Sequence, residues 1–259
     1  TMIGESQFNN RITFWGDARS DNMERQKQYS NNSTSEIHFN SLTPNNSFAD
    51  WGPLYMIIGR ANLNIAKFPE INTYSTNPNS KDYLPEATFR SYMAQCYAMR
   101  AICYFYILRI WGDAPIRTTP FLSLDDNPQA PREPKIKVKQ QIIADLQQAY
   151  EFQAKGATPI IWYVNEGAIA AMMTDVYMWR SHDGEIQPDY NKAIELDLNN
   201  SALYLGRGKA SVQAGDNTTA IADFNTLMKT TTFLDDMAVE VTDYAFPNGA
   251  VGKIITYRM

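Results

Sequence analysis

Apolar residues recur at helical spacing along three segments in the middle of the chain. The three stripes are Leu54, Ile58, Ala61 and Ile65; Phe89, Met93, Tyr97, Ala101, Tyr104, Phe105 and Leu108; and Val138, Ile142, Leu146, Ala149 and Tyr150. Spacings of three and four residues place each set on one face of a helix. We therefore predict a helix from Pro53 to just before Pro69, a second from Pro85 and Glu86 to the stop at Gly112, and a third over 137–153.

An internal repeat follows these helices. Segments 167–200 and 201–234 are each 34 residues long, which is the period of tetratricopeptide repeats. The small and aromatic residues that match the repeat pattern are Tyr177, Tyr190 and Ala193 in the first segment and Tyr204, Gly208, Ala220 and Phe224 in the second. Small residues let two antiparallel helices touch, while aromatic rings fill the groove toward the next pair. The pattern therefore predicts two stacked helix pairs.

Polar segments flank and separate the predicted helices. Residues 1–50 are rich in Asn and Ser, with one apolar island at 11–15, and we predict irregular structure with one short helix there. Segments 72–85 and 111–134 are rich in proline and polar residues, which predicts loops. Near the C-terminus, Lys253 to Tyr257 predicts a short strand.

Composition and charge narrow the class of function. The chain has 259 residues, 44% of them hydrophobic, which is enough for one large domain or two small ones with a sizeable core. A formal net charge of −5 argues against a nucleic-acid partner, which normally requires a basic face. Arg90, Arg100 and Arg109 exclude a membrane span for the most apolar helix, because each costs roughly 3 kcal/mol at the bilayer centre. Cys96 and Cys103 would lie about 10 Å apart on that helix, beyond disulfide reach, so we interpret them as core residues.

The sequence contains no catalytic or cofactor motif. It has two histidines, and it lacks a His-Glu-x-x-His pair, a cysteine cluster and a Gly-x-Ser-x-Gly elbow. The stretch GRGKAS at 206–211 is similar to a phosphate-binding loop, but Leu203 stands where that loop needs glycine, and close helix packing explains its two glycines better. Asp17, Asp21 and Asn22 could offer oxygen ligands to Ca²⁺, although capping of a turn is the simpler interpretation. We therefore expect no enzyme, no cofactor and no metal site.

Five stretches resemble, in order, the successive blocks of SusD/RagB-like proteins. They read WGDARSDN, WGPLYMIIGRANLNI, RSYMAQCYAMRAICYFYILRIWGDAPI, PREPKIKVKQQIIADLQQA and NEGAIAAMMTDVYMW. The third is the most specific, because an aromatic-rich helix with Arg-Ala is followed by Gly-Asp and a proline. The resemblance implies an all-α fold of tetratricopeptide-like helix pairs forming a right-handed scaffold, with long irregular loops. It also implies that residues 1–259 are the N-terminal domain, without the family's lipidated cysteine and C-terminal half.

The same resemblance implies a function. SusD/RagB-like proteins are lipoproteins on the extracellular face of the outer membrane of Bacteroidota, and they take part in polysaccharide utilization. They bind oligosaccharides, or in some members peptides, and deliver them to a SusC-like TonB-dependent transporter. For this chain the resemblance implies contact with the membrane only through a lipid anchor. Two alternatives remain open, namely a tetratricopeptide adaptor that binds a protein partner and a fragment of a carbohydrate-active enzyme.

The resemblance places the ligand face in the loop from Met23 to Asn32. Gln26, Tyr29 and Asn31 are the candidate ligand-binding residues, because a ring can stack on the C–H face of a sugar while amides bond to its hydroxyls. This loop has one tyrosine and no tryptophan, which leaves the ligand class open. The tryptophans Trp15 and Trp51 are expected to pack against helices, and Trp111 to lie in the core.

Overall fold

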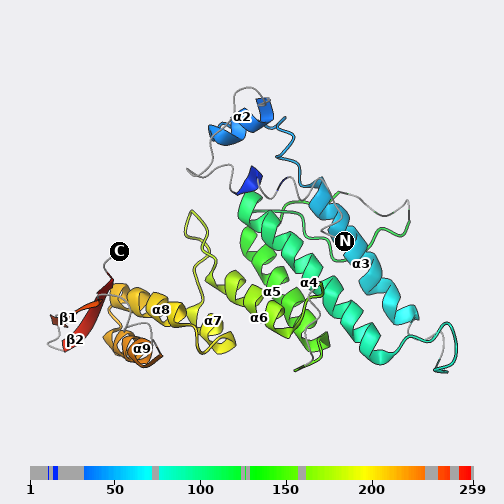
Figure 1. The fold of residues 1–259 in the computed structure, drawn as a ribbon. Helices are drawn as coiled ribbons and strands as arrows, with labels where there is room; N and C mark the ends of the chain where they lie inside the picture. The colour runs from blue at the N-terminus through cyan, green and yellow to red at the C-terminus, as the bar shows by residue number, and fades with distance from the viewer. Residues whose placement is uncertain are drawn as a thin grey trace. The chain divides into compact units, whose positions relative to one another are not determined.

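The computed structural model describes residues 11, 14–16, 32–71, 76–123, 126, 129–156, 162–230, 239–245 and 251–257. Their regular elements are α2 (Asn32–His38), α3 (Gly52–Ile71), α4 (Glu86–Trp111), α5 (Lys135–Phe152), α6 (Glu166–Met178), α7 (Tyr190–Leu196), α8 (Ser201–Ala214), α9 (Asn217–Thr230), β1 (Val239–Ala245) and β2 (Val251–Tyr257) (Figure 1). The chain divides into two compact units, residues 1–172 and 173–259, with the boundary inside α6.

Helices dominate the described part of the chain, which confirms the predicted all-α class. Strands β1 and β2 form the one two-stranded sheet found there, with Val239 paired to Tyr257 and Ala245 to Val251 in antiparallel register. The strand predicted from Lys253 to Tyr257 is therefore confirmed, and it begins two residues earlier. Among the described residues no helix combines the length and the apolar character that a bilayer crossing needs.

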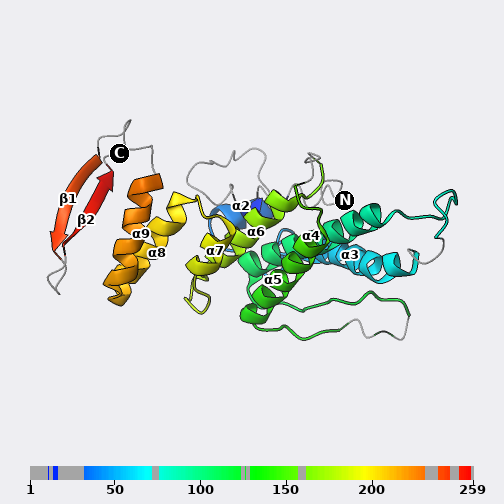
Figure 2. The same cartoon turned by 90° about the horizontal axis from the view of Figure 1, so that it is seen from below.

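Helix α4 is the centre of the first unit and contacts α3 and α5 (Figures 1 and 2). The predicted stripes supply its buried side chains, which include Leu54, Ile58 and Ala61 of α3, Met93, Ala101, Tyr104 and Leu108 of α4, and Val138, Ile142, Leu146 and Ala149 of α5. Phe89, Tyr97 and Phe105 are only half-buried. They lie beside other rings and cations at the margin of the layers, as where Tyr97 stacks on Phe152 at 5.9 Å between centroids and Arg109 lies over Phe105 at 5.3 Å.

The helix ends follow backbone rules, with one correction to the predicted boundaries. Helix α4 stops before Gly112, whose φ of +72° is a conformation that side-chain-bearing residues rarely adopt. Helix α3 does not end before Pro69 but runs through it to Ile71. A proline removes the backbone hydrogen bond of its own nitrogen, and because the helix ends two residues later, only its last turn is weakened.

The apolar island near the N-terminus packs on the segment that precedes α3. Arg11 donates from Nη2 to the Ser47 carbonyl at 2.9 Å, and Trp15 donates from Nε1 to the Phe48 carbonyl at 2.8 Å. The rings of Phe14 and Phe48 lie 4.3 Å apart. The short helix predicted within the first fifty residues corresponds to α2, and Arg11, Phe14 and Trp15 are helical as well.

In the second unit, α8 and α9 are joined by a turn at Gly215 and lie side by side (Figure 1). A Cβ atom on Gly208 would lie 2.7 Å from Cε1 of Phe224, and one on Gly206 would overlap the ring of Tyr190 in α7. This confirms close helix packing as the reason for the glycines of the GRGKAS stretch. Helices α6 and α8 begin at Glu166 and Ser201, within one residue of the predicted starts of the two repeat segments. That 167–200 forms a stacked helix pair, and that the scaffold is right-handed, stay predictions.

Candidate functional site

A cleft of about 550 Å³ opens in the first unit between α3 and the connector, the segment 112–134 that joins α4 to α5. From α3 and the residue before it, the lining comprises Trp51, Tyr55, Ile58, Gly59 and Asn62; from the connector it comprises Pro115, Arg117, Thr119, Phe121, Gln129 and Ala130. One wall is therefore a rigid helix, and the shape of the other depends on how the connector is held.

The two ends of the connector pair with each other. The N–H of Ala114 donates to the carbonyl of Glu133 at 3.1 Å, and the N–H of Glu133 donates back to the carbonyl of Ala114 at 3.0 Å. Beside this bridge, the Tyr55 hydroxyl of α3 donates to the Pro115 carbonyl at 2.6 Å. Backbone hydrogen bonds thus join the two ends of the connector, and the Tyr55 hydroxyl ties the connector at Pro115 to α3.

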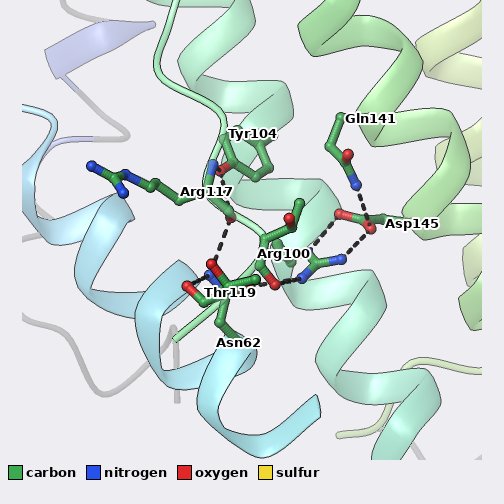
Figure 3. A network of polar contacts seen from close by, with 8 residues as sticks. Asn62, Arg100, Tyr104, Arg117, Thr119, Gln141 and Asp145 are labelled. Atoms are coloured by element: carbon green, nitrogen blue, oxygen red, sulfur yellow. Dashed lines mark hydrogen bonds and ion pairs between the residues drawn. The ribbon is translucent and has the colours of Figure 1, made fainter. Parts of the chain in front are cut away.

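Two buried side chains of the scaffold hold the backbone of the connector further along (Figure 3). Asn62 is 2% exposed, and its Nδ2 donates to the carbonyls of Arg117 and Thr119 at 3.1 and 3.3 Å. The hydroxyl of Tyr104 donates to the Arg117 carbonyl at 2.9 Å and accepts from the Arg117 N–H at 2.6 Å. Burial raises the pKa of Tyr104 to about 12, so this hydroxyl stays protonated and fills both roles.

Arg100 joins this connector network to α5. Its guanidinium donates to both carboxylate oxygens of Asp145 at 2.9 and 2.6 Å, to Oδ1 of Asn62 at 2.8 Å and to the Thr118 carbonyl at 3.2 Å. Burial lowers the pKa of Arg100, but the hydrogen bonds and charge of Asp145 outweigh it and raise the pKa above its ordinary value. Gln141 also donates to Asp145, at 2.9 Å. Arg100 therefore stays positively charged, and it hydrogen-bonds to α3, to α5 and to the connector.

Aromatic rings form much of the wall of the cleft. Trp51 and Tyr55 are edge-to-face neighbours at 5.6 Å between centroids, and Phe121, 53% exposed, lines the same cleft from the connector. Guanidinium groups lie over two of these rings, with Arg132 at 4.8 Å from the centroid of Trp51 and Arg117 at 4.9 Å from that of Phe121. The site therefore offers flat apolar surfaces, together with the amide of Gln129 and the hydroxyl of Thr119 named above.

The residues predicted to bind ligand from the family resemblance, Gln26, Tyr29 and Asn31, lie outside the described residues, and so do Asp17, Asp21 and Asn22. Trp15, Trp51 and Trp111 form a contiguous cluster, with Trp111 5.5 Å from Trp15 and 5.9 Å from Trp51 between centroids. Their expected packing is confirmed for Trp15 and Trp51. The prediction that Trp111 lies in the core is wrong, because its side chain, at the C-terminal end of α4, is only half-buried.

Sequence reasoning missed the residues that shape the cleft. In the sequence, Arg100 argues only against a membrane span and nothing singles out Asp145, although a charged residue on a buried face calls for a partner of opposite charge. Asn62 carries the same signal, since it follows Leu54, Ile58 and Ala61 on the buried side of α3. The connector residues carried no periodic signal at all.

Within the ranges that the structure describes, no group of three or more His, Cys, Asp or Glu side chains is arranged to hold a metal ion. The free thiols of Cys96 and Cys103 both lie on α4, and burial raises the pKa of Cys103. The side chains that line the cleft offer ring stacking, hydrogen bonding and charge.

Comparisons of the sequence and of the structure with known proteins relate this chain to one protein family. A protein-family model of the SusD-like type, described as "Starch-binding associating with outer membrane", matches residues 3–178. A SusD-like protein of Formosa agariphila is 30% identical over 147 residues, which cover 56% of this chain and 26% of that protein. A second SusD-like protein of the same organism is 29% identical over 163 residues, covering 60% and 28%. The chain thus spans about a quarter of the length of these curated relatives.

Solved structures share the fold. A SusD superfamily protein from Bacteroides vulgatus aligns with a TM-score of 0.55 and 21% identity, over 86% of this chain and 39% of that one. A laminarin-binding SusD-like protein aligns with a TM-score of 0.57 and 20% identity, over 73% and 38%. At these identities the likeness concerns the fold.

Proposed function

Because the chain belongs to the SusD-like family, we propose that it is a binding protein for oligosaccharides and that the cleft between α3 and the connector is part of its binding surface. The family description supports a starch-like or other glycan ligand, and one structural relative carries the name of a laminarin-binding protein. A peptide is the second candidate ligand class, because the family resemblance implies peptide binding in some members.

The composition of the cleft is the observation that carries this proposal. A pyranose ring has an apolar face of C–H groups and a rim of hydroxyls, so it needs a flat ring to stack on and amides or hydroxyls around it. Trp51, Tyr55 and Phe121 offer such rings, and Thr119 and Gln129 offer polar groups. A volume of about 550 Å³ lies within the range of about 300–1,000 Å³ typical of small-ligand sites.

We further propose that Gln26, Tyr29 and Asn31 add contacts to the same ligand. Substituting Tyr29→Ala is expected to weaken glycan binding with little change in melting temperature. A large fall in stability at unchanged affinity would assign Tyr29 to packing instead.

The place of the protein in the cell is also a proposal. As a SusD-like protein, it would be anchored by a lipid to the extracellular face of the outer membrane and would pass its ligand to a SusC-like TonB-dependent transporter. Co-purification of the full-length protein with such a transporter from solubilised outer membranes tests this partnership. Recovery with an unrelated soluble protein instead would favour the adaptor alternative.

The binding proposal is tested by calorimetric titration with malto-, laminari- and xylogluco-oligosaccharides. Phe121→Ala removes one stacking ring from an exposed position, so we expect affinity to fall about two- to tenfold, the equivalent of about 0.5–1.5 kcal/mol for an aromatic contact. Phe39→Ala is the matched control, because Phe39 is 64% exposed and does not line the cleft. An equal loss of affinity in both variants would contradict binding at the cleft. Hydrolysis products of the saccharide after the titration would contradict a binding role without catalysis.

A further inference from the structure

One residue in the middle of the α3 wall of the cleft has no side chain. Gly59 lines the cleft four residues after Tyr55 and three residues before Asn62, which places all three on the same face of α3. Inside a helix, glycine is less favourable than every other residue except proline. A glycine in the interior of this 20-residue helix therefore needs a physical reason.

Neither the backbone conformation nor the packing of α3 supplies that reason. The backbone at Gly59 is helical, with the negative φ that any residue adopts. A Cβ atom added there would have no atom of the described part of the chain within 4 Å. By contrast, a Cβ atom on Gly208 of α8 would meet the ring of Phe224 at 2.7 Å. The fold thus requires the glycine of α8 but not the glycine of α3.

The side chains on either side of Gly59 both reach across to the connector. The Tyr55 hydroxyl donates to the Pro115 carbonyl at 2.6 Å. Nδ2 of Asn62 donates to the Thr119 carbonyl at 3.3 Å. Between these two hydrogen-bonded side chains the wall of α3 is backbone alone, and any side chain at Gly59 would project into open space of the cleft.

The space at Gly59 belongs to the same cleft as the groups that would bind a sugar. Trp51 and Tyr55 offer rings from the α3 side, and Thr119 and Phe121 line the cleft from the connector. Because glycine has no Cβ atom, it allows a ligand to approach the backbone closely. A sugar unit that lies against α3 at Gly59 would therefore share the cleft with both rings and polar groups.

We propose that Gly59 is a specificity-determining residue, which leaves the space for one sugar unit of a bound oligosaccharide against α3. This inference rests on the proposed function and deepens it, because it assigns to the α3 wall a limit on the size of the ligand. Gly59 thus lowers the stability of the helix in exchange for access of the ligand, a known compromise between stability and function.

Substitutions at Gly59 separate ligand access from stability. Gly59→Ala is expected to raise the melting temperature or leave it unchanged, because alanine favours the helix and its Cβ meets no described neighbour. The same variant should bind the tightest-binding oligosaccharide about threefold more weakly, and Gly59→Leu at least about tenfold more weakly, because a larger side chain fills more of the cleft. Calorimetric titration measures the affinities, and thermal unfolding measures the stability.

Gly167 supplies the matched control. It is an exposed glycine near the start of α6 and outside the cleft, and a Cβ atom added there would meet only the Asn165 side chain, at 3.5 Å. Gly167→Ala and Gly167→Leu should leave the affinity unchanged. In the unsubstituted protein, intermolecular NOEs from the bound saccharide to the Hα protons of Gly59 are expected as well.

The outcomes for the inference and for the proposed function can be told apart. If the unsubstituted protein binds a saccharide and both Gly59 variants bind it equally well, the inference is wrong while the proposed function stands. A marked fall in the melting temperature of Gly59→Ala would assign the glycine to packing and would also overturn the inference. If the unsubstituted protein binds no malto-, laminari- or xylogluco-oligosaccharide, the proposed function fails and the inference fails with it.

Discussion

At the scale of single residues, Arg100 links every layer that shapes the cleft. It lies on α4, is 4% exposed, and hydrogen-bonds to Asp145 of α5, Asn62 of α3 and the Thr118 carbonyl of the connector. A charge in this position is tolerated only because its partners are present, since an unpaired buried ion carries a large desolvation penalty.

Asp145→Asn tests this dependence. It leaves the Arg100 guanidinium buried without a countercharge, so we expect the free energy of unfolding to fall by about 3–5 kcal/mol in urea denaturation. The double substitution Arg100→Met/Asp145→Leu removes both charges and is expected to recover most of that loss. Asp175→Asn on α6 is the control, because Asp175 is exposed, and a loss equal to that of Asp145→Asn would refute the special role of the pair.

At the scale of elements, the connector is a loop whose conformation is imposed by the helices beneath it. Tyr104 binds both the N–H and the carbonyl of Arg117, and Asn62 binds two of its carbonyls. The connector therefore behaves as part of the scaffold, although its sequence has none of the periodicity of a helix or strand.

Tyr104→Phe is expected to loosen the connector while the helices stay folded. It removes the acceptor of the Arg117 N–H and one donor to its carbonyl, so the Arg117 amide should lose hydrogen-exchange protection and stability should fall by about 1–3 kcal/mol. Hydrogen exchange followed by NMR measures both effects. Unchanged protection at Arg117, with lost protection spread over α4, would mean that Tyr104 supports the core and not the connector.

The α8–α9 pair offers a second test at this scale. Alanine favours a helix over glycine by about 1 kcal/mol, but a Cβ at Gly208 would meet Phe224 at 2.7 Å, and overpacking costs about 1–3 kcal/mol. We therefore expect Gly208→Ala to destabilise the protein in thermal unfolding. At Gly59 of α3 nothing lies within 4 Å of the added Cβ, so Gly59→Ala should be neutral or stabilising. A stabilising Gly208→Ala would overturn the close-packing account.

The helices could be predicted from the sequence, whereas the cleft could not. The stripes of α3, α4 and α5 are local signals, because residues three and four apart share a face whatever the rest of the fold does. Arg100 and Asp145 are 45 residues apart, and only tertiary packing brings them together. The Pro69 boundary was missed because proline weakens a last turn without abolishing it. Gln26, Tyr29 and Asn31 remain predictions.

At the scale of the whole molecule, the chain spans about a quarter of the length of its curated relatives. Its helical scaffold shares the fold of solved SusD superfamily structures. The helices supply the buried stripes and the Arg100 network, which hold the connector in place, and the connector supplies the second wall of the cleft, with Phe121, Thr119 and Gln129. If saccharides bind in the cleft, as we propose, binding and stability rest largely on different residues, so that Phe121 can be changed without disturbing the core.

The central claim is that saccharides bind in the cleft, and the indole N–H resonances of the tryptophans test it most directly. During an NMR titration with the tightest-binding oligosaccharide, the Trp51 resonance, assigned with Trp51→Phe, is predicted to shift with the same dissociation constant as calorimetry. Trp162 is 83% exposed and outside the cleft, so its resonance should stay in place. A saturable shift of Trp162 with Trp51 unmoved would contradict the claim and place the ligand elsewhere.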